Sequence, residues 1–409
     1  MTTKLSSSAL GYAINFMMLV GLVCSAVLFA SSVNKRIEVN YTMKEHLVFD
    51  NIMAVNYGAE ILENKQFQLY HINGDTSRVT VKNWGAFRVV SAKTFHNNNS
   101  VQKTAMIGYS GLYSYATIYM PENKQALKVC GDTQIKGIFI GSERGLERGH
   151  IAGKSYIRDK LIEGETKTGE KFLPELDESV KNITIESFLL ESDKIEFPFR
   201  DSVFSFDNRT SLVTSVEPIT ISNKLKGNLV IHSFHSIEVK KDAQLENIII
   251  IAPEVIFEEG FQGKLQVIAH EKVTLGENVK LNYPSTIVLN EIQENKDVFS
   301  RGVYLNKGAM LVGGILMVSQ KPNFRRPLEL KIDRAVVGGL IYNVGETEVQ
   351  GKVHGYTYTN NFSVKIGGGE YKNHLIDAEM SSTTLPKELI LPQWIKTEEN
   401  KKTEIIRWM

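Results

Sequence analysis

A repeat of 18 residues runs through residues 229–289 and constrains this chain more than any other feature. Apolar residues recur at this spacing in four columns: Ile237, Val255 and Val273; Val239, Phe257 and Leu275; Ala243, Phe261 and Val279; and Ile231, Ile249 and Val267. Within each unit apolar and polar residues alternate, which is the period of a β-strand. One such unit cannot bury its apolar face alone. The repeat therefore predicts stacked coils, about 4.8 Å apart and joined by backbone hydrogen bonds.

The predicted fold class is mainly β, with a β-helix (β-solenoid) of about 18 residues per coil following an N-terminal transmembrane helix and its helical extension. An ordinary β-sandwich with accidental spacing is the alternative. We expect the following division: a short N-terminus and transmembrane helix at 1–32, an amphipathic helix at 33–66, a small β-rich unit at 67–125, the β-helix at 126–380 with an insertion at about 158–225, and a C-terminal cap or tail at 381–409.

The charge balance and the cysteine content exclude two common classes of protein. The chain has 47 Lys and Arg residues against 46 Asp and Glu residues, so it has no surplus of positive charge for binding nucleic acid. Cys24 lies in an apolar run and Cys130 lies far away in a polar context. We therefore expect no nucleic-acid partner and no disulfide framework, and the fold must depend on its core.

An apolar run from Leu10 to Ala30 predicts a membrane anchor. Its 21 residues contain no charged side chain, and as a helix they would span about 31 Å, against about 30 Å for a bilayer core. Cleaved signal peptides usually have an apolar region of about 7–15 residues, so we favour a retained single-pass helix over a cleaved signal. Residues 10–30 would contact the lipid bilayer. The side chains expected to meet lipid or neighbouring helices are Met17, Met18, Leu19, Leu22 and Val23.

The N-terminal region combines three features: a leader of the form Lys4-x-Ser-Ser-Ser-Ala-Leu10, the apolar helix, and an amphipathic extension ending in Asn51–Glu60. Over residues 4–66 this combination resembles minor pilins and large pseudopilins. In that family the helix sits in the inner membrane and packs into a filament tip in type IV pilus and type II secretion machines. The resemblance implies a single-pass protein of the bacterial inner membrane, with most of the chain extracytoplasmic and with protein partners in a pilus or secretion assembly.

A second resemblance concerns the expected coils. Residues 127–140 alternate apolar and polar positions, with Gly131 and Gly137 at corners, where glycine accepts positive φ. This segment is similar to the coils of bactofilins, which are polymer-forming β-helices, and residues 337–358 also look like β-helical ends of this kind. The resemblance implies that copies of the chain could associate as a homo-oligomer.

No constellation of residues predicts catalysis. Glu259 and Glu277 would stack roughly 4.8 Å apart, near the separation of a retaining carboxylate pair, but turn residues are normally charged because they face water. His232, His235 and His270 could suggest a metal site, yet residues three apart in a strand point to opposite faces. Nucleophile elbows, metalloprotease motifs and nucleotide-binding loops are missing from the sequence. We therefore predict no catalytic, cofactor-binding or metal residues, no cofactor, and a protein that is not an enzyme.

The sequence thus predicts a membrane-anchored extracytoplasmic structural or assembly protein, a minor-pilin-like subunit of a pilus or secretion apparatus. One alternative is a membrane-tethered β-helix that binds or acts on carbohydrate; the tyrosines at 109, 113, 115 and 119 could supply a sugar-binding face, or could instead form a strand edge. Another is a bactofilin-like polymer-forming scaffold. Turnover of a polysaccharide would favour the first alternative, and filaments of the coil region would favour the second.

Overall fold

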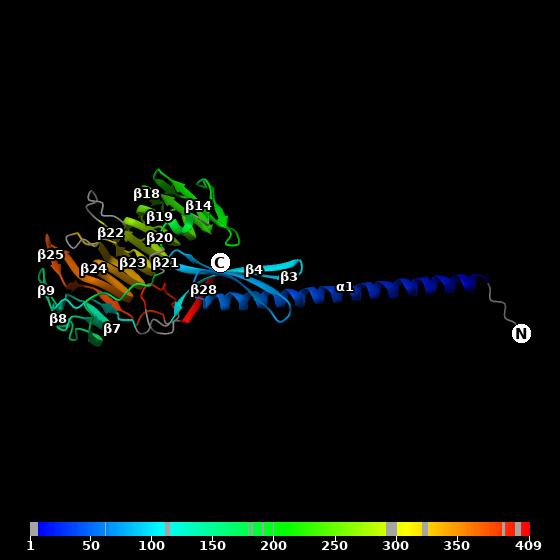
Figure 1. Ribbon diagram of the computed structural model, residues 1–409, viewed down its shortest axis with the longest axis horizontal. Helices are drawn as coiled ribbons and strands as arrows, with labels where there is room; N and C mark the ends of the chain where they lie inside the picture. Colours follow the sequence, from blue (N-terminus) through cyan, green and yellow to red (C-terminus); the bar gives the residue numbers. More distant parts are fainter. Residues whose placement is uncertain are drawn as a thin grey trace.

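The computed structural model describes residues 7–61, 63–110, 115–178, 180, 183–189, 192–198, 200–291, 301–320, 326–386, 389–396 and 402–409. One long helix leads into an antiparallel sheet, and a larger body of mostly parallel strands lies beyond that sheet (Figure 1). The predicted N-terminal helix and the mainly β content are both present. The arrangement of the parallel strands differs from the prediction.

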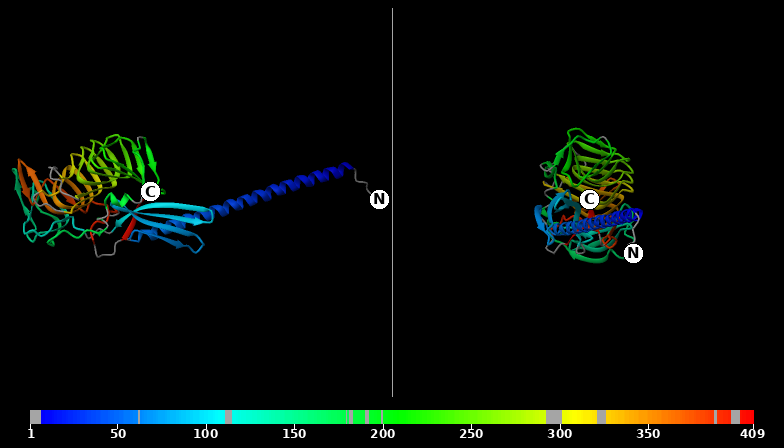
Figure 2. Two further views of the ribbon diagram at one scale, coloured as in Figure 1. Left: turned by 45° about the horizontal axis from the view of Figure 1, so that its top comes forward. Right: turned by 90° about the vertical axis from the view of Figure 1, so that its right-hand side faces the viewer.

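The helix α1 runs without a break from Ser7 to Ala59, a length of 53 residues. At 1.5 Å per residue it is about 80 Å long. Neither proline nor glycine occurs between Gly21 and Gly58, so nothing in that stretch breaks the helix. Its N-terminal part projects away from the rest of the protein, and its C-terminal part lies along the sheet (Figure 2).

The antiparallel sheet joins two distant parts of the sequence. Its order is β1 (Lys65–Tyr70), β2 (Thr76–Trp84), β3 (Phe87–His96), β4 (Asn99–Ser110) and β28 (Lys402–Trp408). The last strand pairs with β4, with Lys402 opposite Ser110 and Trp408 opposite Ala105. The chain therefore leaves this sheet after β4, builds the parallel body, and returns to the same sheet at its end.

The two faces of the sheet bury different partners, as strand alternation requires. On one face Val79, Val90 and Ile107 form a core with Ala54 and Val55 of α1. The opposite face carries a second group of apolar residues that belongs to a core shared with the parallel body: Trp84, Phe87, Val89 and Met106. The sheet is thus a layer between the helix and the parallel strands.

Parallel pairings link most of the remaining strands into a closed barrel. Its strands are β5 (Ile118–Tyr119), β7 (Gln134–Gly141), β11 (Glu163–Thr168), β12 (Ser192–Lys194), β13 (Ser202–Phe204), β14 (Thr210–Ser215), β15 (Ile219–Ile221), β16 (Lys224–Gly227), β17 (Leu229–Ser233), β18 (Ser236–Val239), β19 (Gln244–Phe257), β20 (Gln262–Leu275), β21 (Lys280–Glu291), β22 (Gly302–Leu305), β23 (Met310–Ser319), β24 (Glu329–Ile366), β25 (Gly369–Lys372) and β27 (Glu379–Ser381). We call this body the parallel barrel.

Short elements complete the described part of the chain. The strands β6 (Leu127–Cys130), β8 (Leu146–Arg148) and β26 (His374–Ile376) form a three-stranded sheet, and β9 (His150–Ile151) pairs with β10 (Lys154–Ser155). The helix α2 (Glu186–Leu189) contacts β14.

The predicted β-helix (β-solenoid) is wrong, because the strand pairings close into a barrel. The strands β5 and β7 pair with each other, and each also pairs with a strand from the end of the barrel sequence, β24 for β5 and β27 for β7. An open stack would leave the backbone groups of its first and last strands without hydrogen-bond partners. Closure supplies these partners. A local repeat predicts which neighbours pair, but it carries no information about how the first and last strands are joined.

The predicted coil length also holds only locally. Ile237 lies opposite Val255, and Val255 lies opposite Val273, which is the 18-residue step of the repeat. The next partner of Val273 is Val303, thirty residues further on, and Val303 is paired with Leu330. The polar stretch after residue 289 lengthens this step, while the apolar residues stay in one buried core.

Candidate membrane and assembly segment

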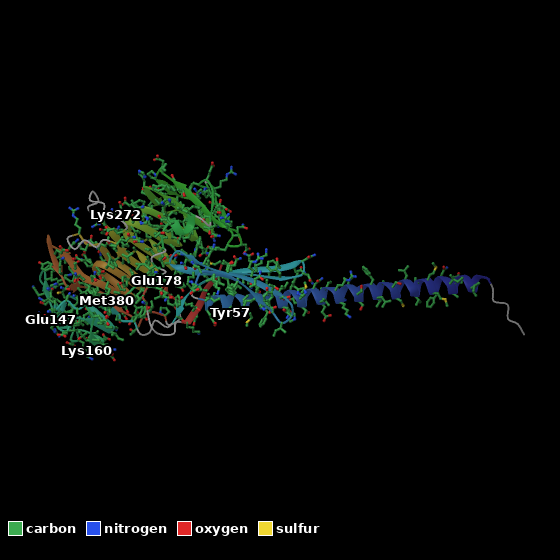
Figure 3. All side chains as sticks on the ribbon, viewed as in Figure 1. Tyr57, Glu147, Lys160, Glu178, Lys272 and Met380 are labelled. Atoms are coloured by element: carbon green, nitrogen blue, oxygen red, sulfur yellow. The ribbon has the colours of Figure 1, made fainter. Side chains whose placement is uncertain are left out.

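The projecting part of α1 is the feature of this structure that most directly suggests a function. By length and composition α1 can cross a membrane, and none of its most apolar stretch is buried. The residues predicted to meet lipid are exposed by between 55% and 74%: Met17, Met18, Leu19, Leu22 and Val23. Figure 3 shows these turns with side chains pointing into open space, whereas Tyr57 lies where the helix meets the body of the protein. Exposing so large a continuous apolar surface to water is energetically unfavourable, so this segment requires a lipid or protein environment.

The C-terminal turns of α1 pack closely on the sheet. Leu47, Ala54 and Val55 are fully buried. At Gly58 a Cβ atom would lie 2.7 Å from a methyl carbon of Val90 and 2.8 Å from one of Val79, closer than real Cβ contacts. Glycine therefore lets the helix backbone approach the sheet more closely than a residue with a Cβ atom could without displacing these methyl groups.

A buried asparagine, Asn51, fixes the helix at this position. Asn51 is fully buried, and its Nδ2 lies 2.8 Å from the Ala92 carbonyl, 3.0 Å from Thr94 Oγ1 and 3.1 Å from the Val101 carbonyl. The Thr94 hydroxyl also shares a hydrogen bond with Ser77. Because buried polar groups need partners, these bonds select one rotation and one depth of α1 on the sheet.

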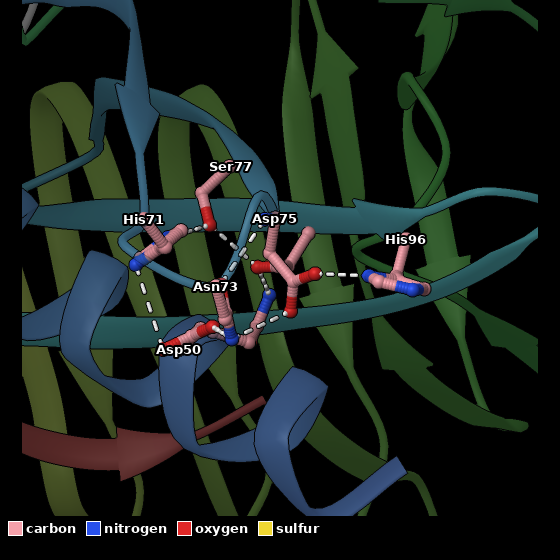
Figure 4. Close-up of polar contacts among 8 residues, drawn as sticks. Asp50, His71, Asn73, Asp75, Ser77 and His96 are labelled. Atoms are coloured by element: carbon pink, nitrogen blue, oxygen red, sulfur yellow. Dashed lines mark hydrogen bonds and ion pairs between the residues drawn. The ribbon is translucent and has the colours of Figure 1, made fainter. Parts of the chain in front are cut away.

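Polar side chains extend this network to the strand ends nearest the projecting helix (Figure 4). Asn73 Nδ2 donates to the Asp50 carboxylate at 2.7 Å, and His71 Nδ1 lies 3.5 Å from the same carboxylate. Asp75 accepts from Asn73 and also bonds His96. The network therefore ties α1 to the β1–β2 connection and to the end of β3.

Sequence reasoning missed this network, although a signal was present. His71, Asn73 and Asp75 lie in the turn between β1 and β2, and Ser77 follows in β2. Asn and Asp are common turn residues that also bond neighbouring groups. A turn this rich in polar side chains, close to an amphipathic helix, could have indicated a hydrogen-bonded cluster.

The structure does not bring the considered carboxylates into an active site. Glu259 and Glu277 are exposed at turns, and the Gly260 amide donates to the Glu277 carbonyl at 2.9 Å, so the two turns are neighbours. Among the described residues no group of three or more His, Cys, Asp or Glu side chains could hold a metal ion.

The three considered histidines have different environments. His232 is buried, its ring lies 4.6 Å from that of Phe234, and burial, with a smaller contribution from the charge of His270, lowers its pKa. His235 is exposed, and His270 is hydrogen-bonded to the Asn290 carbonyl at 3.0 Å. They do not form a shared metal site.

The tyrosine cluster lies in the protein interior. Tyr115 packs edge-on against Tyr356 and Tyr358, and Tyr119 stacks on Tyr358 with ring centroids 5.3 Å apart. Tyr109 is also buried, and residue 113 lies outside the described residues. The described tyrosines of this group therefore offer no sugar-binding face.

Comparisons with known proteins give little further information. Neither a scan against protein-family models nor a search of curated proteins found a match. A search of solved structures found a weak likeness to the competence-associated pilin ComZ from Thermus thermophilus, with 8% sequence identity and a TM-score of 0.25, covering 85% of this chain and 86% of that one. A likeness at this score carries no argument about fold or function.

Proposed function

We propose that this chain is a membrane-anchored, pilin-like structural subunit that uses α1 both as its anchor and as its contact with partner proteins. The observation that carries the proposal is the division of one continuous helix into an exposed apolar part and a buried, hydrogen-bonded part. The first part needs lipid or other helices, and the second part holds the body of the protein at a fixed position relative to them. The resemblance of residues 4–66 to minor pilins and large pseudopilins supports the same role.

In the proposed arrangement the helix lies in the inner membrane of a bacterium and the sheet and parallel barrel lie outside the cytoplasm. The role is mechanical: the subunit presents a rigid body to a pilus or secretion assembly, and it requires neither a cofactor nor catalytic residues. The bactofilin-like alternative depended on open coils that stack end to end, and the closed barrel removes that basis.

Cysteine labelling in cells tests the proposed orientation. The native cysteines give a low background, because Cys130 is fully buried and Cys24 lies in the apolar part of α1. In a variant in which both are replaced, Lys160→Cys places a single thiol at an exposed site of the body, far from α1 (Figure 3). A membrane-impermeant maleimide should label this thiol on intact spheroplasts. Labelling only after the membrane is permeabilised would refute the orientation.

Mass spectrometry of the N-terminus and crosslinking test the anchor and the assembly role. Protein isolated from its native membrane should retain residues 10–30, and a cut after about residue 30 would show that α1 is a signal sequence. A photo-crosslinker at Leu22 should capture helices of other membrane proteins. The matched position Tyr70, exposed at the edge of the sheet, serves as the control. Crosslinks from Leu22 to lipid alone would leave an anchor and contradict the assembly role.

A further inference from the structure

A groove runs between the antiparallel sheet and the parallel barrel. One hollow of about 540 Å³ is lined by residues of β4, β13, β16, β19 and β28 and of the turn after β13. A second, of about 410 Å³, is lined by residues of β2, β3, β4 and the same turn. The two hollows share four lining residues, Gln102, Thr104, Phe206 and Asp207. They are therefore continuous, and we call them together the sheet–barrel groove. In Figure 2 the barrel strands near β14 lie over the sheet strands.

The groove exists because one face of the sheet changes character along its strands. Near the β2–β3 turn this face is apolar, and Trp84 and Phe87 pack into the core shared with the barrel. Further along the same strands the face carries Thr80, Ser91 and Gln102, which are only partly buried. The barrel no longer covers these residues tightly, so a polar face lies opposite a second wall across an open space.

Both walls offer hydrogen-bonding groups suited to hydroxyls. Ser91 and Gln102 come from the sheet, and Asp207 and Asn208 come from the barrel. Hydroxyl groups both donate and accept, an amide does so through separate atoms, and a carboxylate accepts through two oxygens. A ligand whose surface carries many hydroxyls can use all of these groups.

An aromatic residue completes the groove. Trp408 is 43% exposed at the wall formed by β28, and the Lys103 ammonium lies 5.4 Å from the centroid of its ring. The other two tryptophans of the chain, Trp84 and Trp394, are 1% exposed. A half-exposed indole offers a large, rigid apolar face beside polar groups, which suits the apolar face of a sugar ring.

The groove carries charges of both signs. Lys226 binds Glu246 at 2.6 Å, and Arg209 binds Asp193 at 3.1 Å. Lys82 lies 3.5 Å from the Thr210 hydroxyl, Lys103 lies against the Trp408 ring, and Asp207 adds a negative charge to the wall. Binding of a nucleic acid depends on cations that neutralise phosphates, so the test below includes an oligonucleotide to separate a polyanion from a neutral chain.

We propose that the sheet–barrel groove binds a neutral oligosaccharide chain, with Trp408 against the face of one sugar ring and with Gln102 and Asp207 bonded to ring hydroxyls. A groove, unlike a closed pocket, accepts a segment in the middle of a linear polymer. This inference goes beyond the proposed assembly role and does not depend on it.

Tryptophan fluorescence of the full chain gives a direct test. The protein is purified in a detergent without a sugar headgroup and titrated with short neutral cello-, malto-, manno- and chito-oligosaccharides. Because Trp408 is the solvent-facing tryptophan, occupancy should shift the emission and protect it from quenching by acrylamide. Three single substitutions should each weaken oligosaccharide binding by at least about tenfold: Trp408→Ala, Gln102→Ala and Asp207→Ala. Binding to the first variant is measured by calorimetry, because it lacks the reporting tryptophan, and binding to the other two by fluorescence.

A matched control is available in the segment after β11. Phe172 is exposed, with the Lys171 ammonium 5.4 Å from its ring centroid, as in the pair of Lys103 and Trp408. Phe172→Ala should bind like the unmodified protein, and circular dichroism of every variant should show the native spectrum. The proposal is overturned if no oligosaccharide of the panel binds at millimolar concentration, if the three groove variants bind unchanged, or if only a single-stranded oligonucleotide binds.

Discussion

Replacing Asn51 by alanine should loosen α1 from the sheet while leaving the helix itself intact. The Asn51 amide has two N–H donors, so it can fully satisfy two of its three neighbouring acceptors at a time. Val101 is partly exposed, and Thr94 keeps its bond to Ser77. Ala92 is buried and loses this donor, but it stays paired with Val79 and Lys103 in the sheet. The main cost of Asn51→Ala is therefore the loss of the side-chain hydrogen bonds and of the packing of the amide.

The size of the effect follows from these contacts. Each lost hydrogen bond costs about 0.5–1.5 kcal/mol, and the lost side-chain packing adds to it. Alanine has a higher helix propensity than asparagine, which reduces this cost by about 0.5 kcal/mol. We expect a net loss of about 2 kcal/mol in the free energy of local opening, which corresponds to about thirtyfold faster exchange of the amides that this opening exposes.

Hydrogen–deuterium exchange of the full chain in detergent measures this opening directly. Peptides covering residues 47–59 should exchange faster in Asn51→Ala than in the unmodified protein. Asn56→Ala is the matched control, because Asn56 lies on the same helix with its side chain exposed. Equal exchange in the two variants would show that the Asn51 bonds do not hold α1 in place.

Three further perturbations test other parts of the structure. Gly58→Leu should also speed amide exchange in residues 47–59, because its Cβ would overlap valine methyl groups of the sheet. Overpacking of this kind costs about 1–3 kcal/mol. Unchanged exchange would contradict the close approach of helix and sheet. Lys226 and then Arg407 lower the pKa of Glu246 to about 2, so this carboxylate stabilises the fold above pH 4.5 and loses its effect as the pH falls towards 2. For this partly exposed group we expect a contribution of about 1 kcal/mol, seen as a smaller fall of Tm over that range in Glu246→Gln. Burial raises the pKa of the Cys130 thiol, so Cys130 should resist iodoacetamide until the protein unfolds, and rapid labelling of the native protein would refute its burial.

The sequence was most informative where structure depends on neighbours in the chain. The apolar run from Leu10 to Ala30 predicts a helix because a span of this length needs internal hydrogen bonds in lipid, and the helix is present. The apolar columns predicted which strands pair around Val255, because a step of 18 residues brings the same side of each strand to the core.

The sequence was uninformative where structure depends on distant pairings. Ile118 lies opposite both Phe139 and Thr357, and Ser110 lies opposite Lys402. No repeat relates these segments, and alternation alone permits many partners for a short strand. The groove has the same origin, since its walls come from β2–β4, the start of the barrel and β28. The site therefore could not be predicted without the closure of the barrel and the return of the last strand.

The joint between sheet and barrel determines what the anchor can position. Gln266, buried in the barrel, donates to the Trp84 carbonyl at 2.9 Å and accepts from the Ala86 amide at 2.7 Å, and so it binds both sides of the β2–β3 turn. Close by, Trp84 packs edge-on against Phe188. Because Asn51 fixes the helix on the same sheet, these contacts form one continuous path of buried interactions from α1 to the barrel. A rotation of the helix in a membrane or filament would therefore turn the barrel and its groove as one body, whereas a flexible stalk would leave their orientation free.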